Sequence, residues 1–161
     1  MVSECIFCQI VQAKKPSHRI LENEKFLAFL SIFPNTQGVT VVIPKQHYSS
    51  YAFDLDEQVL TDLVLFSKKV ARYLDAYFPD VGRTAMVFEG FGVDHVHAKL
   101  FPMHGTAHTN EKWQEIKSNV DQYFHQYAGY ISTHDQHGIS SEELAALATA
   151  IRQSIEKQQV T

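Results

Sequence analysis

Two histidines and a lysine recur at every second position in the segment from Val93 to Pro102. The segment alternates polar and apolar residues and ends at a proline, a pattern typical of a half-buried strand. On a strand, His95, His97 and Lys99 would lie on one face, with successive side chains about 6.5 Å apart. A row of two imidazoles and one ammonium suits an anion or a metal ion. Three solvated polar side chains on a sheet face are the alternative.

His97 has the chemistry of a nucleophile that attacks phosphorus. An imidazole of ordinary pKa is partly neutral at pH 7, and one ring nitrogen can attack while an acceptor holds the other N–H. The ammonium of Lys99 could stabilise charge on the phosphoryl oxygens. The backbone amides of Gly90 and Gly92 could approach the same oxygens closely.

A catalytic metal ion is the competing interpretation of this strand, because two histidines at this spacing also serve zinc hydrolases. The ion would be held by His95, His97 and a third ligand, either Asp94 or His104. By the alternation, Asp94 points to the face opposite the histidines, which disfavours it.

Cys5 and Cys8 form a C-x-x-C pair, whose spacing lets one turn of backbone supply two thiolates to a tetrahedral ion. His47 and His95 are the best candidates for the remaining ligands, because each lies at an end of a predicted strand. Two buried free cysteines in an amphipathic helix are the alternative. A thioredoxin-like redox pair is disfavoured, because these cysteines precede all of the predicted strands.

The composition fits one globular domain without large polyanionic partners. A chain of 161 residues with 45% hydrophobic residues can bury a sizeable core. The formal net charge of −4, without an evident cluster of Lys and Arg, argues against a nucleic-acid binder. No apolar run approaches the length of a membrane span, and the first residues lack the pattern of a secretory signal. We therefore expect a cytoplasmic protein with no nucleic-acid or membrane partner.

The apolar patterns predict five strands, with one long helix between the third and the fourth. The strands are expected at residues 19–22, 25–32, 39–43, 84–88 and 93–102. The long helix should begin at a capping box of Asp54 and Glu57 and end before Pro79, with its apolar stripe covering one face of the sheet. A short N-terminal helix should end before Pro16.

The single domain is expected to consist of a core, residues 1–105, and a C-terminal helical extension, residues 106–161. Within the extension, an apolar stripe from Trp113 to Tyr127 predicts a helix ended by Gly129. A short extended piece should follow it.

A capping box of Ser140 and Glu143 predicts the start of a last helix. Its inner apolar face should consist of Leu144, Leu147, Ala148, Ile151 and Ile155.

Four stretches, taken in order and spacing, resemble the histidine triad (HIT) superfamily of nucleotide hydrolases and transferases. They are residues 5–10, residues 26–32 with Pro34, residues 41–47, and residues 95–100 with Pro102. The resemblance implies an α+β HIT-like fold whose five-stranded antiparallel sheet pairs with a second copy to form a homodimer. It also implies an enzyme that hydrolyses a phosphoanhydride or phosphoramidate bond at the α-phosphate of a nucleotide, such as a dinucleoside polyphosphate or a nucleoside phosphoramidate.

The resemblance assigns roles to particular positions. His97 falls on the nucleophile, which would form a nucleotidyl-histidine intermediate that water then hydrolyses. Lys99 and Gly92 fall on the phosphate contacts. A structural zinc ion would be held by Cys5, Cys8, His47 and His95. The nucleoside pocket would be formed by Ile6, Phe7, Ile10, Phe29, Ser31, Ile32 and Val41, although simple core packing also explains its apolar members.

The chain also departs from the family pattern. Lys99 replaces the third histidine, and Ser31 stands where an aspartate usually contacts the ribose hydroxyls. Val39 stands where histidine is common, and Phe91 and Gly92 replace the usual polar residues of the preceding turn. These changes favour a second hypothesis, a nucleotide-binding module with little or no catalysis.

Overall fold

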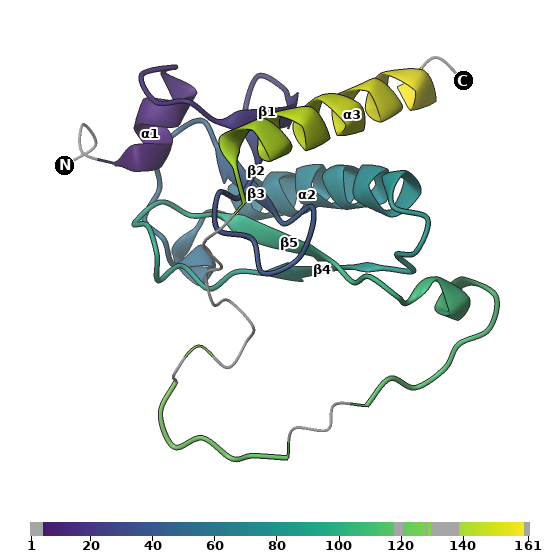
Figure 1. Ribbon diagram of the computed structural model, residues 1–161. Helices are drawn as coiled ribbons and strands as arrows, with labels where there is room; N and C mark the ends of the chain where they lie inside the picture. The colour runs from purple at the N-terminus through teal and green to yellow at the C-terminus, as the bar shows by residue number, and fades with distance from the viewer. Residues whose placement is uncertain (1–4, 118–120, 128, 130–138, 160–161) are drawn as a thin grey trace.

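A five-stranded antiparallel sheet forms the centre of the protein, as the sequence predicts. The structure is a computed structural model that describes residues 5–117, 121–127, 129 and 139–159 (Figure 1). The sheet has the strand order β1-β2-β3-β5-β4 with every neighbouring pair antiparallel. The strands are β1 (His18–Glu22), β2 (Phe26–Leu30), β3 (Thr40–Pro44), β4 (Thr84–Val87) and β5 (Ala98–Pro102).

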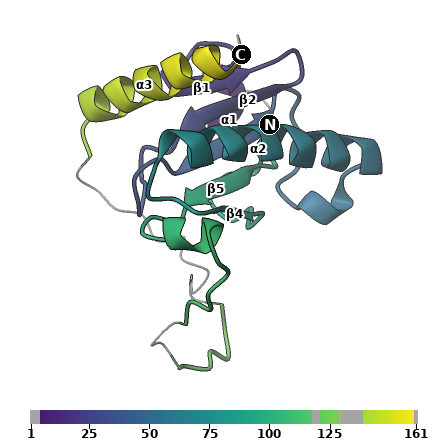
Figure 2. The ribbon, with the colours of Figure 1, turned by 90° about the vertical axis from the view of Figure 1, so that its right-hand side faces the viewer.

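Helices cover both faces of the sheet, which explains why β2 and β3 are apolar at almost every position. Alternate β2 residues such as Ala28 share one core cluster with α2 (Glu57–Tyr77) and α3 (Ser141–Gln159). Figure 2 shows α2 crossing in front of the sheet. The intervening β2 residues pack on the other face against α1 (Ile6–Val11). Each face of the sheet therefore has its own apolar cluster.

The two long helices begin at different kinds of cap. Ser140 and Glu143 form the predicted capping box of α3: the Ser140 hydroxyl accepts from the Glu143 amide at 3.1 Å, and the Ser140 amide donates to the Glu143 carboxylate at 2.8 Å. The predicted cap of α2 is wrong. Asp54 lies in a separate 3-10 turn, and Asp56 caps α2 by accepting from the Gln58 amide at 2.9 Å.

The fifth strand is shorter than the predicted span, 93–102, and begins at Ala98. Before it, the Val96 amide donates to the Tyr48 carbonyl at 3.1 Å, and the Asp94 carboxylate accepts from the Ser50 amide at 2.9 Å. The segment before Ala98 is thus tied to the loop after β3 by one backbone amide and one side chain, and it forms no ladder. The alternation of faces nevertheless continues through this segment, because Val96 and Ala98 both face the α2 side.

The predicted helix between Trp113 and Tyr127 is wrong for the described part of that span, which is irregular. Trp113 is 69% exposed and Tyr123 is 80% exposed. An apolar stripe stabilises a helix only where a surface buries it, and these side chains have no such surface. The extended piece expected at 130–133 lies outside the described residues.

The last helix packs into the main core and is not an isolated appendage. Its predicted inner face is confirmed, since Leu144, Ala148, Ile151 and Ile155 are buried in the cluster that also contains α2 and the sheet. The division into a core of 105 residues and an extension stays a prediction. Of the described helices, none combines the length and apolar character that crossing a bilayer requires.

Asp80 joins two loops near the end of β5 and should make stability sensitive to acid. Its carboxylate accepts from His104 Nδ1 at 3.1 Å and from the Gly105 amide at 3.2 Å. The bond from His104 is the main cause that holds the pKa of Asp80 below its ordinary value of 3.8. Because the folded-state pKa is lowered, this contribution is complete above about pH 4 and disappears as the pH falls through the lowered pKa.

At neutral pH the Asp80→Asn variant should therefore be less stable than the wild type. As the pH is lowered, the free energy of unfolding of the variant should fall less than that of the wild type. Urea unfolding midpoints measured between pH 2 and pH 7 test this, with the exposed Asp54, changed to Asn, as a control. Parallel pH curves for wild type and Asp80→Asn would contradict the assignment.

Candidate active site and metal centre

Four side chains distant in sequence converge between α1 and the sheet. They are Cys5, Cys8, His47 and His95, whose ligand atoms all lie within 4.8 Å of one another. His95 Nδ1 lies 3.4 Å from Cys5 Sγ, 3.6 Å from Cys8 Sγ and 3.3 Å from His47 Nδ1. Cys8 Sγ lies 3.5 Å from His47 Nδ1.

These separations fit the edges of a tetrahedron around one ion. With bond lengths of about 2.05 Å to nitrogen and 2.3 Å to sulfur, tetrahedral coordination places two nitrogens about 3.3 Å apart and a nitrogen and a sulfur about 3.6 Å apart. The four distances between ligand atoms given above, from 3.3 to 3.6 Å, lie close to these values. The residues present therefore fit a tetrahedral metal ion.

Local structure aims each side chain at this point. Cys5 is the N-cap residue of α1 and Cys8 follows one turn later. His47 comes three residues after the end of β3. His95 is fully buried, and its Nε2–H donates to the Pro44 carbonyl at 2.9 Å, so that Nδ1 carries the free lone pair.

The electrostatics of the cluster suit a bound cation. Burial lowers the pKa of His95 to about 4, so its ring is neutral, as a ligand must be. Burial and the neighbouring Cys5 raise the pKa of the Cys8 thiol to about 11. A cation bound by the four ligand atoms would offset the cost of burying the charged thiolates.

His97 lies next to the cluster but outside it. The ring is buried, and Nδ1–H donates to the His95 carbonyl at 2.7 Å, which leaves Nε2 as the nitrogen with a free lone pair. Burial lowers the pKa of His97, and the charge of Lys99 lowers it further, against the opposing charge of Glu89. The edge of the Phe7 ring contacts both histidines, with centroids 5.2 Å from His97 and 5.8 Å from His95.

The two residues expected as a third ligand of a catalytic metal ion, Asp94 and His104, both contact other groups. His104 Nε2 lies 3.0 Å from the Gln37 carbonyl, and its other ring nitrogen contacts Asp80. The Asp94 carboxylate is bonded to the loop after β3. The structure therefore places His97 outside the cluster of possible metal ligands.

The expected nucleoside-binding residues divide into two groups. Four of them form one apolar cluster on the α1 face of the sheet: Phe7, Ile10, Phe29 and Val41. The other three, Ile6, Ser31 and Ile32, lie outside this cluster, and Ile6 and Ile32 are exposed. The hydroxyl of Ser31 accepts from the Phe33 amide at 3.2 Å.

The turn before the histidines requires glycine at only one of its two glycine positions. Gly90 has φ of +76°, and a Cβ there would lie 2.7 Å from the Ser50 carbonyl oxygen. A Cβ on Gly92 would meet no atom within 4 Å. The turn therefore requires glycine at position 90, whereas position 92 has room for a larger side chain.

Gly90→Ala should destabilise the protein by about 2 kcal/mol, because the substitution combines a left-handed backbone with a contact to main chain. Gly92→Ala is the matched control and should change stability by less than about 0.5 kcal/mol. Equilibrium urea unfolding measures both. Equal losses in the two variants would show that the turn differs from this description.

Glu89 belongs to the candidate site, although no sequence motif predicted it. Its carboxylate lies 3.8 Å from Lys99 Nζ, and the Tyr127 hydroxyl donates to its other oxygen. The register pairs Val87 with Lys99, so Glu89, two residues beyond, would lie opposite His97 on the same face. An acidic residue directly after the predicted strand at 84–88 was the only available signal.

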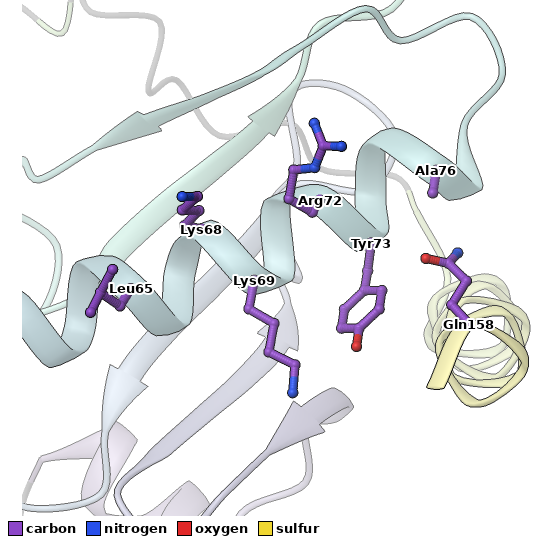
Figure 3. A pocket seen from close by; sticks show the side chains of 7 residues that line it. All are labelled: Leu65, Lys68, Lys69, Arg72, Tyr73, Ala76 and Gln158. Atoms are coloured by element: carbon purple, nitrogen blue, oxygen red, sulfur yellow. The ribbon is translucent and has the colours of Figure 1, made fainter. Parts of the chain in front are cut away.

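A basic patch lies elsewhere, on the outer side of α2. A pocket of about 390 Å³ lies there. Figure 3 shows that Gln158 comes from α3 and the other lining side chains from α2. It is lined by Leu65, Lys68, Lys69, Arg72, Tyr73, Ala76 and Gln158. Basic residues do cluster here, contrary to the sequence-based expectation, but none of the lining residues belongs to the candidate site.

Comparison with known proteins places the chain in a family. The HIT domain pattern matches residues 12–106, which include all five strands and His97. An uncharacterized HIT-like protein of Methanocaldococcus jannaschii is 34% identical over 124 residues, 73% of this chain and 92% of that protein. An adenosine 5'-monophosphoramidase of Schizosaccharomyces pombe is 35% identical over 102 residues, 61% of this chain and 73% of that enzyme.

The fold is also that of a known structure, a Zn-bound histidine triad family protein from Mycobacterium smegmatis. The TM-score is 0.67 at 21% identity, with 99% of both chains covered. The family pattern covers more than half of the sequence and contains the entire sheet. The chain therefore belongs to the HIT domain family.

Proposed function

We propose that the protein is a nucleotide hydrolase that cleaves a phosphoanhydride or phosphoramidate bond at the α-phosphate, through a covalent intermediate on His97. The observation that carries this proposal is the hydrogen bond from His97 Nδ1–H to the His95 carbonyl at 2.7 Å. It fixes the ring so that the lone pair of Nε2 is available for attack. The naming of the Schizosaccharomyces pombe relative as a monophosphoramidase supports the same reaction class.

The proposed reaction has two displacements at phosphorus. In the first, a bond forms between His97 Nε2 and the α-phosphorus while the bond to the leaving group breaks, and the leaving group keeps the bonding pair. In the second, water attacks the phosphorus, the bond to Nε2 breaks with its electron pair returning to the nitrogen, and the water passes a proton to solvent. The net reaction consumes one water molecule and yields a nucleoside monophosphate.

The substrate would lie across the α1 face of the sheet. We assign the nucleoside to the expected pocket residues, with the phosphates near the Lys99 ammonium and the Gly92 amide. The buried cluster that contains Phe7 supplies the apolar part of this surface, next to the nucleophile. Lys99 would offset charge that develops on the phosphoryl oxygens.

A structural zinc ion held by Cys5, Cys8, His47 and His95 is part of the proposal. Four protein ligands leave no open coordination position, which is the hallmark of structural sites. When bound, the ion would cross-link α1 to the loops after β3 and before β5. This chain's own residues would then keep Phe7 against the rings of His95 and His97.

A cytoplasmic homodimer, expected from the sequence and the family resemblance, completes the proposal. Light scattering of the purified chain tests the dimer. Two free cysteines agree with a reducing compartment.

Turnover assays test the function. Purified protein should hydrolyse an adenosine phosphoramidate or a diadenosine polyphosphate to AMP. The second candidate function, a nucleotide-binding module, is favoured by the contact of Lys99 with Glu89 and the local bond of Ser31. That alternative predicts AMP binding by calorimetry without hydrolysis of either substrate.

A further inference from the structure

The candidate phosphate end of the site contains a carboxylate beside its cation. Glu89 Oε2 lies 3.8 Å from Lys99 Nζ, and only 10% of the Glu89 side chain is exposed. A carboxylate at this place repels additional phosphate groups, which the hydrolysis of a polyphosphate chain would have to bring close to it. The charge of Glu89 should therefore affect which leaving groups the site accepts.

The segment after the sheet holds Glu89 in this position. The Tyr127 hydroxyl donates to Glu89 Oε1, while the Tyr127 ring lies 5.3 Å from the ring of Phe91. Two separate contacts thus hold Tyr127 against the turn that precedes His97. The carboxylate has a partner on each oxygen, Tyr127 on one and Lys99 on the other, so its direction is constrained.

The two substrate classes differ in the charge of the group that leaves. A phosphoanhydride releases an anionic phosphate with the bonding pair. A phosphoramidate nitrogen first takes a proton from solvent, becomes cationic, and then leaves as an amine with the bonding pair. A nearby carboxylate stabilises the cationic nitrogen and destabilises the anionic phosphate chain.

We infer that Glu89, positioned by Tyr127, determines specificity by favouring amine leaving groups over leaving groups that carry further phosphates. The inference rests on the proposed hydrolase function and narrows its substrate class. Lys99 supplies charge to the α-phosphate in both cases. Glu89 discriminates between the leaving groups that are attached to that phosphate.

The test compares kcat/KM for an adenosine 5'-phosphoramidate of an alkylamine with kcat/KM for diadenosine tetraphosphate. The wild type should prefer the phosphoramidate. Glu89→Gln, which removes the charge but keeps the shape, should reduce the preference ratio by roughly tenfold, the factor for a solvent-screened charge contact of about 1.4 kcal/mol. Tyr127→Phe should reduce it by roughly two- to fivefold, the factor for one hydrogen bond.

Matched controls separate this effect from general damage. Glu111→Gln and Tyr123→Phe change exposed residues of the same types and should keep the wild-type ratio. Glu89→Asp retains the charge and should retain most of the preference. Because the ratio compares two substrates on one preparation, a partly unfolded fraction cancels.

An unchanged ratio in Glu89→Gln, with both substrates turned over by the wild type, would overturn this inference and leave the hydrolase function standing. A wild-type preference for diadenosine tetraphosphate would do the same. Absence of turnover of both substrates by the wild type would overturn the hydrolase function and this inference together.

Discussion

His97→Ala should lower kcat for hydrolysis by at least roughly a thousandfold, because the substitution removes the only atom to which the nucleotide is transferred. His97→Asn is the sharper variant. Its amide can still donate to the His95 carbonyl as Nδ1–H does at 2.7 Å, but it has no nucleophilic nitrogen. It should therefore be as inactive as His97→Ala while folding normally. Steady-state release of AMP measures both.

His108→Ala is the matched control, since this histidine is exposed and lies outside the site. It should keep wild-type kcat. If His97→Asn retained more than a tenth of wild-type kcat, the nucleophile would be another residue or a water molecule, and the proposed mechanism would fail.

Removal of the metal ion should destabilise the protein strongly. An ion that binds the folded chain and not the unfolded chain stabilises it by RT ln(1 + [ion]/Kd), which is roughly 3–5 kcal/mol when the free ion is several hundred- to several thousandfold above Kd. In a domain of this size such a loss lowers the melting temperature by about 10 °C or more. Thermal unfolding with and without a chelator, together with elemental analysis, measures the effect.

His47→Ala should reproduce the chelator's effect and abolish its further action, whereas His108→Ala should melt like the wild type. A chelator that abolished hydrolysis without changing the melting temperature would identify a catalytic ion. That result would contradict the separation of the ligands from His97.

The sheet could be predicted because its strands carry unambiguous local signals. The run from Val39 to Ile43 is β-branched at every position and is followed by a proline, and burial on both faces explains its lack of alternation. The helical stripe of α2 and the capping box at Ser140 were likewise readable, because helix periodicity and caps are local properties.

The errors arose where distant contacts decide the local structure. Residues 93–97 alternate like a strand, but the loop after β3 takes their hydrogen bonds. The stripe around Trp113 has helical spacing, but no described surface buries it. Asp54 has the better capping signal in sequence, with Glu57 three residues later, but the extended backbone at Leu55 separates Asp54 from α2 and leaves Asp56 as the cap.

The candidate site was predictable where its members sit in recognisable motifs. The C-x-x-C pair and the two strand-end histidines do converge, because each lies at a fixed end of a short element. Glu89 could not be foreseen, because its contact with Tyr127 joins residues 38 apart through an irregular segment. The same holds for the distinction between Gly90 and Gly92, which depends on the approach of Ser50.

The most direct test of the account is to trap the covalent intermediate. Wild-type protein mixed with an adenosine phosphoramidate and quenched within the first turnover should carry an adenylyl group, and peptide mass spectrometry should place it on His97. The His97→Asn variant should carry none. An adduct on another residue, or hydrolysis by the wild type without any adduct at single-turnover times, would contradict the proposed role of His97.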